Sequence, residues 1–200
     1  MEEVIKAQPL SENNIGYIRI TTFNVNTKPE LEEVLGGFNK DSNIQGIILD
    51  LRNNPGGLLD SAIEVASEFI KEGPIVHIKD REGEKVTTPS KGNNYPSWPL
   101  IVLINKGSAS ASEIVSGAIQ DSKRGKLLGE KTFGKGVVQQ VFNLSDGSGV
   151  VITTSEYFTP NERSINHIGI EPDILIEAAL DSEEDVQLDK AIELLEEELK

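Results

Sequence analysis

The chain contains no cysteine, and basic residues are scarce beside acidic ones. Without cysteine, disulfides and thiolate metal sites are excluded, but the compartment stays open because many exported proteins also lack disulfides. Lys and Arg number 19 against 33 Asp and Glu, for a formal net charge of -14. This balance argues against a nucleic-acid-binding surface, which needs clustered Lys and Arg. We interpret the excess of acidic residues as a solubilising surface. Half of the net negative charge lies in the last twenty residues.

Several longer patterns are absent as well. No stretch approaches the roughly 18 apolar residues that would span a bilayer, and residues 1–4 have neither the basic nor the apolar region of a secretory signal. There is no internal repeat, no metal-ligand spacing of His, Asp and Glu, and no Walker or dinucleotide glycine pattern. With 200 residues, 37% of them apolar, we expect one soluble domain without a cofactor.

Strand-like and helical segments alternate through most of the chain. Residues 15–20 alternate like a strand, and residues 28–38 place apolar side chains at helical spacing. The same patterns predict strands at 46–51, 74–79, 99–105 and 126–129, and helices at 59–70 and 110–120. Strands that alternate with helices predict an α/β fold with much parallel sheet.

The last third of the chain adds a hairpin and a helix. Residues 137–144 and 149–158 alternate strongly around Ser-Asp-Gly-Ser, which predicts an antiparallel hairpin and hence a mixed sheet. The polar residues 81–97 are expected to form a surface loop or hairpin. Ser182 is the expected N-cap of a terminal helix over 182–200, whose apolar stripe would dock on the body of the chain or on a second subunit.

Ser110 is the first candidate for chemistry. A serine at the start of a helix after a buried strand lies where backbone N–H groups point outward and positive charge accumulates, so an oxyanion would be stabilised there. The alternative is that Ser110 and Glu113 form an S-x-x-E capping box. Ser108 and Ser112 compete with Ser110 for either role.

Two other segments could complete a site. Gly56 and Gly57 follow a strand end, where backbone amides could converge on a ligand, although a plain turn explains them equally. Lys135 stands between two glycines and could act as a general base if its pKa were depressed, with Gln139 orienting its amine. Otherwise, Lys135 is a solvated turn residue and Gln139 an ordinary strand residue.

Histidine offers a rival mechanism. His77 or His167 could serve Ser110 in a triad. The third member would be one of three aspartates: Asp50, Asp121 or Asp173. Each histidine is also compatible with an incidental position in a strand or loop.

Six ordered motifs carry a resemblance over most of the chain. They are IGYIRI (15–20), DLRNNPGGLL (50–59), GSASASEI (107–114), GEKTFGKG (129–136), YFTP (157–160) and GIEPD (169–173). Together they resemble the core of the C-terminal processing peptidases, also called tail-specific proteases. The resemblance implies a ClpP/crotonase-like fold and a Ser/Lys dyad of Ser110 and Lys135. It also implies that Gln139 orients the lysine and that the oxyanion donors are Gly56 or Gly57 and the amide of Ala111.

The chain departs from the family pattern in two places. A PDZ module, which captures substrate C-termini, normally lies just before the core and is missing here, so residues 1–14 are expected to be a remnant of the junction. The chain would then be a fragment or an unusually short member of the family. Glu162 also stands where the family usually has glycine, so the turn before Ser164 is expected to differ locally.

These observations leave three hypotheses. The first is a serine endopeptidase that processes or degrades proteins near their C-termini, outside the cytoplasm by resemblance, with a possible homo-oligomer through the terminal helix. The second is a latent core that binds peptides or assembles with a partner. The third, acyl-CoA chemistry on a crotonase-type fold, gives no reason for Ser110 to be paired with Lys135.

Overall fold

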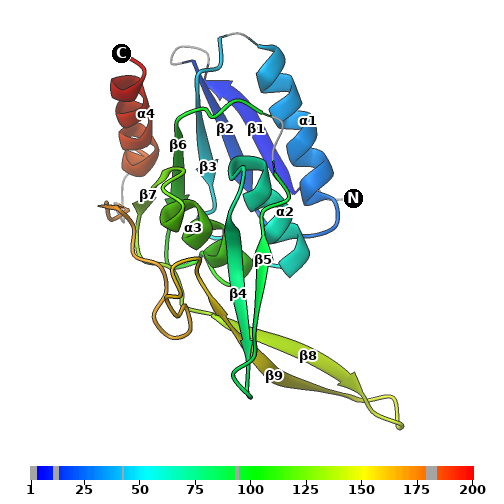
Figure 1. Cartoon of the computed structure of the whole chain (residues 1–200). Helices are drawn as coiled ribbons and strands as arrows, with labels where there is room; N and C mark the ends of the chain where they lie inside the picture. The colour runs from blue at the N-terminus through cyan, green and yellow to red at the C-terminus, as the bar shows by residue number, and fades with distance from the viewer. Residues whose placement is uncertain (1–3, 11–13, 42, 93–94, 179–183) are drawn as a thin grey trace.

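The computed structural model describes residues 4–10, 14–41, 43–92, 95–178 and 184–200 (Figure 1). Its helices are α1 (Thr27–Lys40), α2 (Leu59–Phe69), α3 (Ala111–Asp121) and α4 (Val186–Glu198). Its strands are β1 (Ile5–Leu10), β2 (Ile15–Ile20), β3 (Gly46–Asp50), β4 (Pro74–Asp80), β5 (Lys85–Pro89), β6 (Leu100–Ile104), β7 (Lys126–Gly129), β8 (Val137–Asn143), β9 (Gly149–Phe158) and β10 (Ile174–Leu175). None of the helices in these ranges is long and apolar enough to cross a membrane.

A six-stranded sheet forms the centre of the molecule. Its order is β1-β2-β3-β6-β7-β10, in which β1 is antiparallel to β2 and every other neighbouring pair is parallel. The predicted α/β fold with a mixed sheet is therefore confirmed. Because parallel strands end at the same edge, the segments that follow β3 and β6 lie side by side there, where the Ala109 N–H donates to the Asn54 carbonyl oxygen at 3.0 Å.

Helices cover both faces of this sheet (Figure 1). Side chains alternate along a strand, so Ile47 and Leu49 of β3 join the core beneath α1, α2 and α3, whereas Ile48 joins the cluster that contains Ala191 and Leu195 of α4. The apolar stripe of the terminal helix thus packs on the sheet of its own chain. The two faces of one continuous apolar strand are buried by helices distant in sequence.

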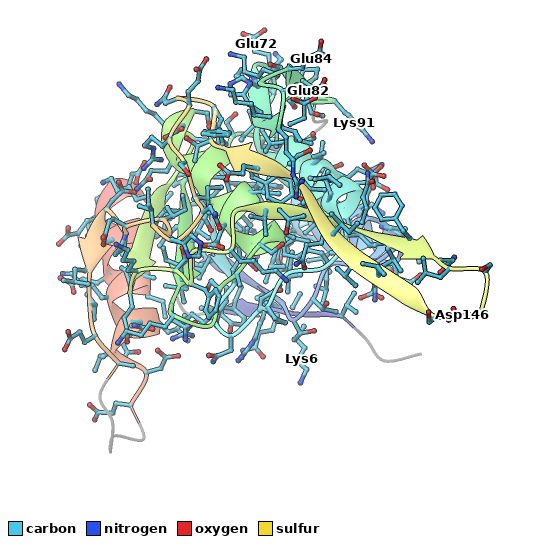
Figure 2. All side chains as sticks on the ribbon, turned by 90° about the horizontal axis from the view of Figure 1, so that it is seen from below. Lys6, Glu72, Glu82, Glu84, Lys91 and Asp146 are labelled. Atoms are coloured by element: carbon cyan, nitrogen blue, oxygen red, sulfur yellow. The ribbon has the colours of Figure 1, made fainter. Side chains whose placement is uncertain are left out.

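A second, antiparallel sheet has the order β5-β4-β9-β8. The predicted hairpin of β8 and β9 is confirmed, and it projects from the body as a two-stranded ribbon with Asp146 near its tip (Figure 2). Residues 81–97 were predicted to form a surface loop or a hairpin. This segment contains β5, which pairs with β4 in an antiparallel hairpin.

The terminal helix begins later than predicted. Asp185 is its N-cap and accepts a hydrogen bond from the Leu188 N–H, so α4 starts at Val186. Ser182, the predicted cap, lies outside the described residues. Either residue type caps a helix well, and the sequence pattern did not distinguish the two positions.

Candidate active site

Ser110 immediately precedes α3 and has an unusual backbone conformation, with φ 53° and ψ -110°. Positive φ is uncommon for residues other than glycine and persists where surrounding contacts impose it, often at functional sites. The capping box with Glu113 is present: the Ser110 N–H donates to Glu113 Oε2 at 2.8 Å, and the Glu113 N–H faces the Ser110 side chain. The Glu113 N–H also donates to the Ser110 carbonyl oxygen at 2.9 Å. Capping and an exposed position at the helix start therefore coexist at Ser110.

The two neighbouring serines are committed to other contacts. Ser108 is fully buried, and its hydroxyl donates to the Leu51 carbonyl oxygen at 2.8 Å. Ser112 is also fully buried, and its hydroxyl donates to the Asn54 carbonyl oxygen at 2.9 Å. Ser110 is partly exposed. Of the three serines, it is the one available to a substrate.

Gly56 lies directly against the start of α3. A Cβ at Gly56 would come within 2.9 Å of the Ser110 Cβ and 3.0 Å of the Ala111 backbone nitrogen. At Gly57, with φ 147°, a Cβ would lie 2.0 Å from the Phe23 carbonyl oxygen. The turn can approach Ser110 this closely because both residues lack a side chain.

The backbone N–H groups in this region differ in availability. The Gly56 N–H donates to Asn54 Oδ1 at 2.8 Å. The N–H groups of Gly57 and Ala111 have no hydrogen-bond acceptor within the described ranges. Gly57 and Ala111 are therefore better placed than Gly56 to donate to an oxyanion, and the assignment of all three stays a prediction.

The loop that carries Lys135 is fixed to the start of α3. The Phe133 N–H donates to the Ser108 carbonyl oxygen at 3.0 Å. The N–H groups of Gly134 and Lys135 donate to Glu113 Oε1 and Oε2 at 2.7 and 2.8 Å. A Cβ at Gly136 would lie 2.3 Å from the Asn166 nitrogen, so this loop is also packed tightly against residues 165–169.

The side chains of the predicted dyad are not joined. Lys135 is exposed, and its amine has no hydrogen bond or ion pair with any residue that the structure describes, Ser110 included. Gln139 is exposed on β8 at a register shift and is likewise not bonded to Lys135. The fold brings together the two backbone segments that hold Ser110 and Lys135. The Ser110 hydroxyl and the Lys135 amine are not hydrogen-bonded to each other.

Neither histidine reaches Ser110. The ring of His77 is hydrogen-bonded to Thr87 Oγ1 at 2.8 Å and to the Pro160 carbonyl oxygen at 3.1 Å. His167 lies exposed in a turn with φ 59°. Of the three candidate aspartates, Asp50 contacts Arg52 and Tyr17, Asp121 contacts Arg163 and Asn161, and Asp173 contacts Leu127 and Gln120. The described residues therefore give the triad hypothesis no hydrogen-bonded support.

Sequence patterns did not reveal a partly buried ionic network beside the turn that contains Gly56 and Gly57. Asp50 is fully buried and accepts hydrogen bonds from Arg52 and from the Tyr17 hydroxyl, the latter at 2.7 Å. Burial, followed by the negative charge of Asp50, raises the pKa of Tyr17 above its usual range. Arg52 in turn donates to Asp185 at the start of α4, 133 residues away. The sequence feature that could have indicated this network is the charged pair Asp50 and Arg52 at the end of a strand that is otherwise apolar.

No group of three or more His, Cys, Asp or Glu residues in the described part of the chain could hold a metal ion. The groups gathered around Ser110 are a carboxylate, backbone amides and the backbone of the segment that carries Lys135. These groups are suited to acyl transfer through a serine, in which an oxyanion is held by N–H donors.

Comparison with known proteins agrees with this chemistry. A profile of peptidase family S41 matches residues 14–176. The carboxyl-terminal-processing protease of Synechocystis sp. is 43% identical over 188 residues, which cover 91% of this chain and 44% of that protein. The chloroplastic C-terminal processing peptidase of Tetradesmus obliquus is 43% identical over 168 residues, or 84% of this chain and 36% of that protein.

A solved structure supports the same assignment. The photosystem II D1 C-terminal processing protease has a TM-score of 0.79 and 40% identity, covering 91% of this chain and 46% of that structure. The ClpP/crotonase-like fold is therefore confirmed. The chain spans less than half the length of these three relatives. Since the profile covers most of the chain and the relatives are at least 40% identical, the chain belongs to peptidase family S41.

Proposed function

We propose that this chain is the core of a serine endopeptidase in which Ser110 is the nucleophile and Lys135 the general base. The observation that carries this proposal is the double contact of Glu113 Oε2, which accepts the N–H groups of both Ser110 and Lys135 at 2.8 Å. A single buried carboxylate thus anchors the two segments beside each other. Family membership adds support, since the matched relatives are named processing proteases.

The reaction would proceed in two halves. The Ser110 Oγ attacks the scissile carbonyl carbon while its proton moves to the Lys135 Nζ. The carbonyl oxygen becomes an oxyanion near the free N–H groups of Gly57 and Ala111, at the positive end of α3. Lys135 then protonates the leaving amine, and the acyl group stays on Ser110. In the second half, Lys135 takes a proton from a water molecule whose oxygen attacks the acyl carbon, and it returns that proton to the Ser110 Oγ as the ester bond breaks.

To act as a general base, the Lys135 amine must be better shielded from water than it is in this structure. A general-base lysine must be neutral before attack, and removal from water favours the neutral amine. The Lys135 side chain is exposed. We therefore expect a bound substrate chain to cover the amine and bring it to Ser110, and we expect Gln139 to orient it.

The same exposure favours a second candidate function. Because the Lys135 amine is not hydrogen-bonded to Ser110, the core can be latent and act as a peptide-binding or assembly module. This alternative predicts that the chain binds an unfolded protein without cutting it. It also predicts that Ser110→Ala leaves binding unchanged.

A turnover assay separates the two functions. The chain, Ser110→Ala and Lys135→Ala are each incubated with an unfolded protein, and fragments are measured by mass spectrometry. Lys131→Ala is the matched control, because this lysine of the same loop makes only an exposed ion pair with Glu171. Peptidase function predicts fragments with the chain and the control and none with the other two variants. Binding without fragments supports the latent module.

We also propose that substrates are cut near their C-termini, outside the cytoplasm. The names of the matched relatives refer to carboxyl-terminal processing, and one is chloroplastic. A substrate with a blocked C-terminus tests the first point, and fractionation of cells that make the protein tests the second. A homo-oligomer through the exposed face of α4 stays a prediction, which sedimentation of the chain would check.

A further inference from the structure

We propose that Asp185 and Gln187, at the start of α4, are positioning residues that act through Arg52 on the glycine turn beside Ser110. This inference rests on the proposed peptidase function and adds a residue set to the same site. Asp185 and Gln187 do not touch the reacting groups. They hold the side chain of Arg52, and the backbone of Arg52 begins the turn that leads to Gly56 and Gly57.

The Arg52 guanidinium has an acceptor for each of its five N–H groups. Asp185 accepts two, from Nη1 at 2.7 Å and from Nη2 at 2.8 Å, in the bidentate geometry that makes such pairs strong. Asp50 also accepts two, from Nε at 3.0 Å and from Nη2 at 2.7 Å. Gln187 Oε1 accepts the fifth, from Nη1 at 3.1 Å. Arg52 is therefore held from the strand side and from α4 at once.

The α4 side of this contact is itself well anchored. Gln187 is buried, and its Nε2 donates to the Ile176 carbonyl oxygen at 2.7 Å. Asp185 accepts the Leu188 N–H as the helix cap, and the pKa of its carboxyl lies below the usual range, mainly because Arg52 donates to it. Ala191 and Leu195 then fix the helix on the sheet. Asp185 thus presents its carboxylate to Arg52 from a helix that is packed on the central sheet.

The path from Arg52 to Ser110 is short. Arg52 begins the turn, and its own N–H donates to Asp50 Oδ1 at 2.9 Å. Asn53 follows with φ 59°, and the Asn54 carbonyl oxygen accepts the Ala109 N–H at 3.0 Å. Gly56 then lies against the Ser110 Cβ. Gly57, one of the proposed oxyanion donors, is only five residues after Arg52. A change in the position of Arg52 is therefore expected to shift the Gly57 N–H.

The expected consequence concerns catalysis more than substrate binding. The N–H groups of Gly57 and Ala111 matter most when negative charge develops on the carbonyl oxygen. A misplacement of these donors therefore lowers kcat and leaves KM for a peptide almost unchanged. A purely structural role for Asp185 would lower stability and leave the kcat of the folded protein unaltered.

The test compares Asp185→Asn with Asp189→Asn. Both variants remove one negative charge from the first turns of α4, but Asp189 is exposed and has no contact with Arg52. For Asp185→Asn we expect kcat to fall about tenfold and KM to change by less than about twofold. The amide signals of Gly56 and Gly57 in ¹⁵N NMR spectra of the folded chain should shift. Asp189→Asn should change none of these.

A double variant checks the route through Arg52. Lysine cannot bridge Asp50 and Asp185 bidentately, so Asp185→Asn should add little to the loss already caused by Arg52→Lys. Full additivity, or unchanged glycine amide signals in Asp185→Asn, would overturn the proposal. Shifted signals in a chain that cleaves nothing would support the coupling and count against the peptidase function, so the two failures are distinguishable.

Discussion

The backbone N–H groups of Ser110 and Lys135 donate to the same oxygen atom, Oε2 of Glu113, each at 2.8 Å. Residues 25 positions apart are thereby held at a shared acceptor. The other oxygen of Glu113 accepts the Thr132 hydroxyl at 2.6 Å and the Gly134 N–H at 2.7 Å. A fully buried carboxylate with four donors, and no cation among its described partners, organises the candidate site.

Glu113→Gln should therefore damage both folding and activity. The amide has one accepting oxygen, so its NH₂ group would face two donors that lose their acceptor. We expect the free energy of unfolding in urea to fall by about 3 kcal/mol and turnover to fall about a hundredfold. Glu171→Gln is the control, because Glu171 makes only an exposed ion pair with Lys131. Normal stability in Glu113→Gln would contradict this role.

Gly57→Ala should disrupt the turn beside Ser110. The new Cβ would lie 2.0 Å from the Phe23 carbonyl oxygen at a φ of 147°, so we expect a loss of about 3 kcal/mol or more in unfolding free energy. Gly37→Ala is the matched control, since a Cβ there meets nothing within 4 Å on an exposed helical position. It should gain about 0.5–1 kcal/mol. Equal effects of the two changes in urea denaturation would contradict the close approach of Gly57 to Phe23.

Glu162→Gly should stabilise the protein. Glu162 has φ 62° in a turn where its N–H donates to the Thr159 carbonyl oxygen at 2.8 Å, a conformation that glycine adopts without strain. The exposed ion pair with Lys85 contributes little. We expect the thermal midpoint to rise by roughly 2–4 °C. Glu162→Ala, which loses the ion pair and keeps the strain, should show no rise, and a rise in both variants would refute the explanation.

Glu68 should make stability depend on pH. Burial, and then the negative charge of Glu32, raise the pKa of the buried Glu68 carboxyl. A raised pKa in the folded state means that ionisation opposes folding, so stability falls as pH rises through the ordinary range of Glu, about 4.3. Glu68→Gln should therefore stabilise the chain at pH 7.

Urea denaturation at two pH values tests this sign. The gain from Glu68→Gln should be present at neutral pH and disappear below about pH 4, where both states bind the proton. Glu33→Gln, on the exposed side of α1, removes one negative charge without burial and serves as the control. A gain that is the same at both pH values would contradict the burial effect.

The periodicity of apolar residues predicted most elements, because burial on a sheet or a helix face imposes that period. It missed β1, which contains Pro9 and exposes most of its residues at the sheet edge. It could not separate the sheets either. β4 reads as another buried strand, yet His77 of β4 pairs with Phe158 of β9 in the second sheet, a choice made by tertiary contacts.

Local pattern also limited the prediction of the site. The S-x-x-E motif predicted the capping box of Ser110 and Glu113, but the other partners of that carboxylate lie 19 to 22 residues further along the chain. The Arg52 contact with Asp185 spans 133 residues. Such contacts depend on which elements the fold places side by side, and a single sequence carries no local signal for them.

The most direct test of the Ser110 and Lys135 pair is the labelling rate of Ser110 by a fluorophosphonate, followed by peptide mapping. We predict one adduct, on Ser110, that forms at a rate greatly reduced in Lys135→Ala and unchanged in Lys131→Ala. An adduct on Ser108 or Ser112, no adduct on Ser110, or an equal rate in Lys135→Ala would contradict the account.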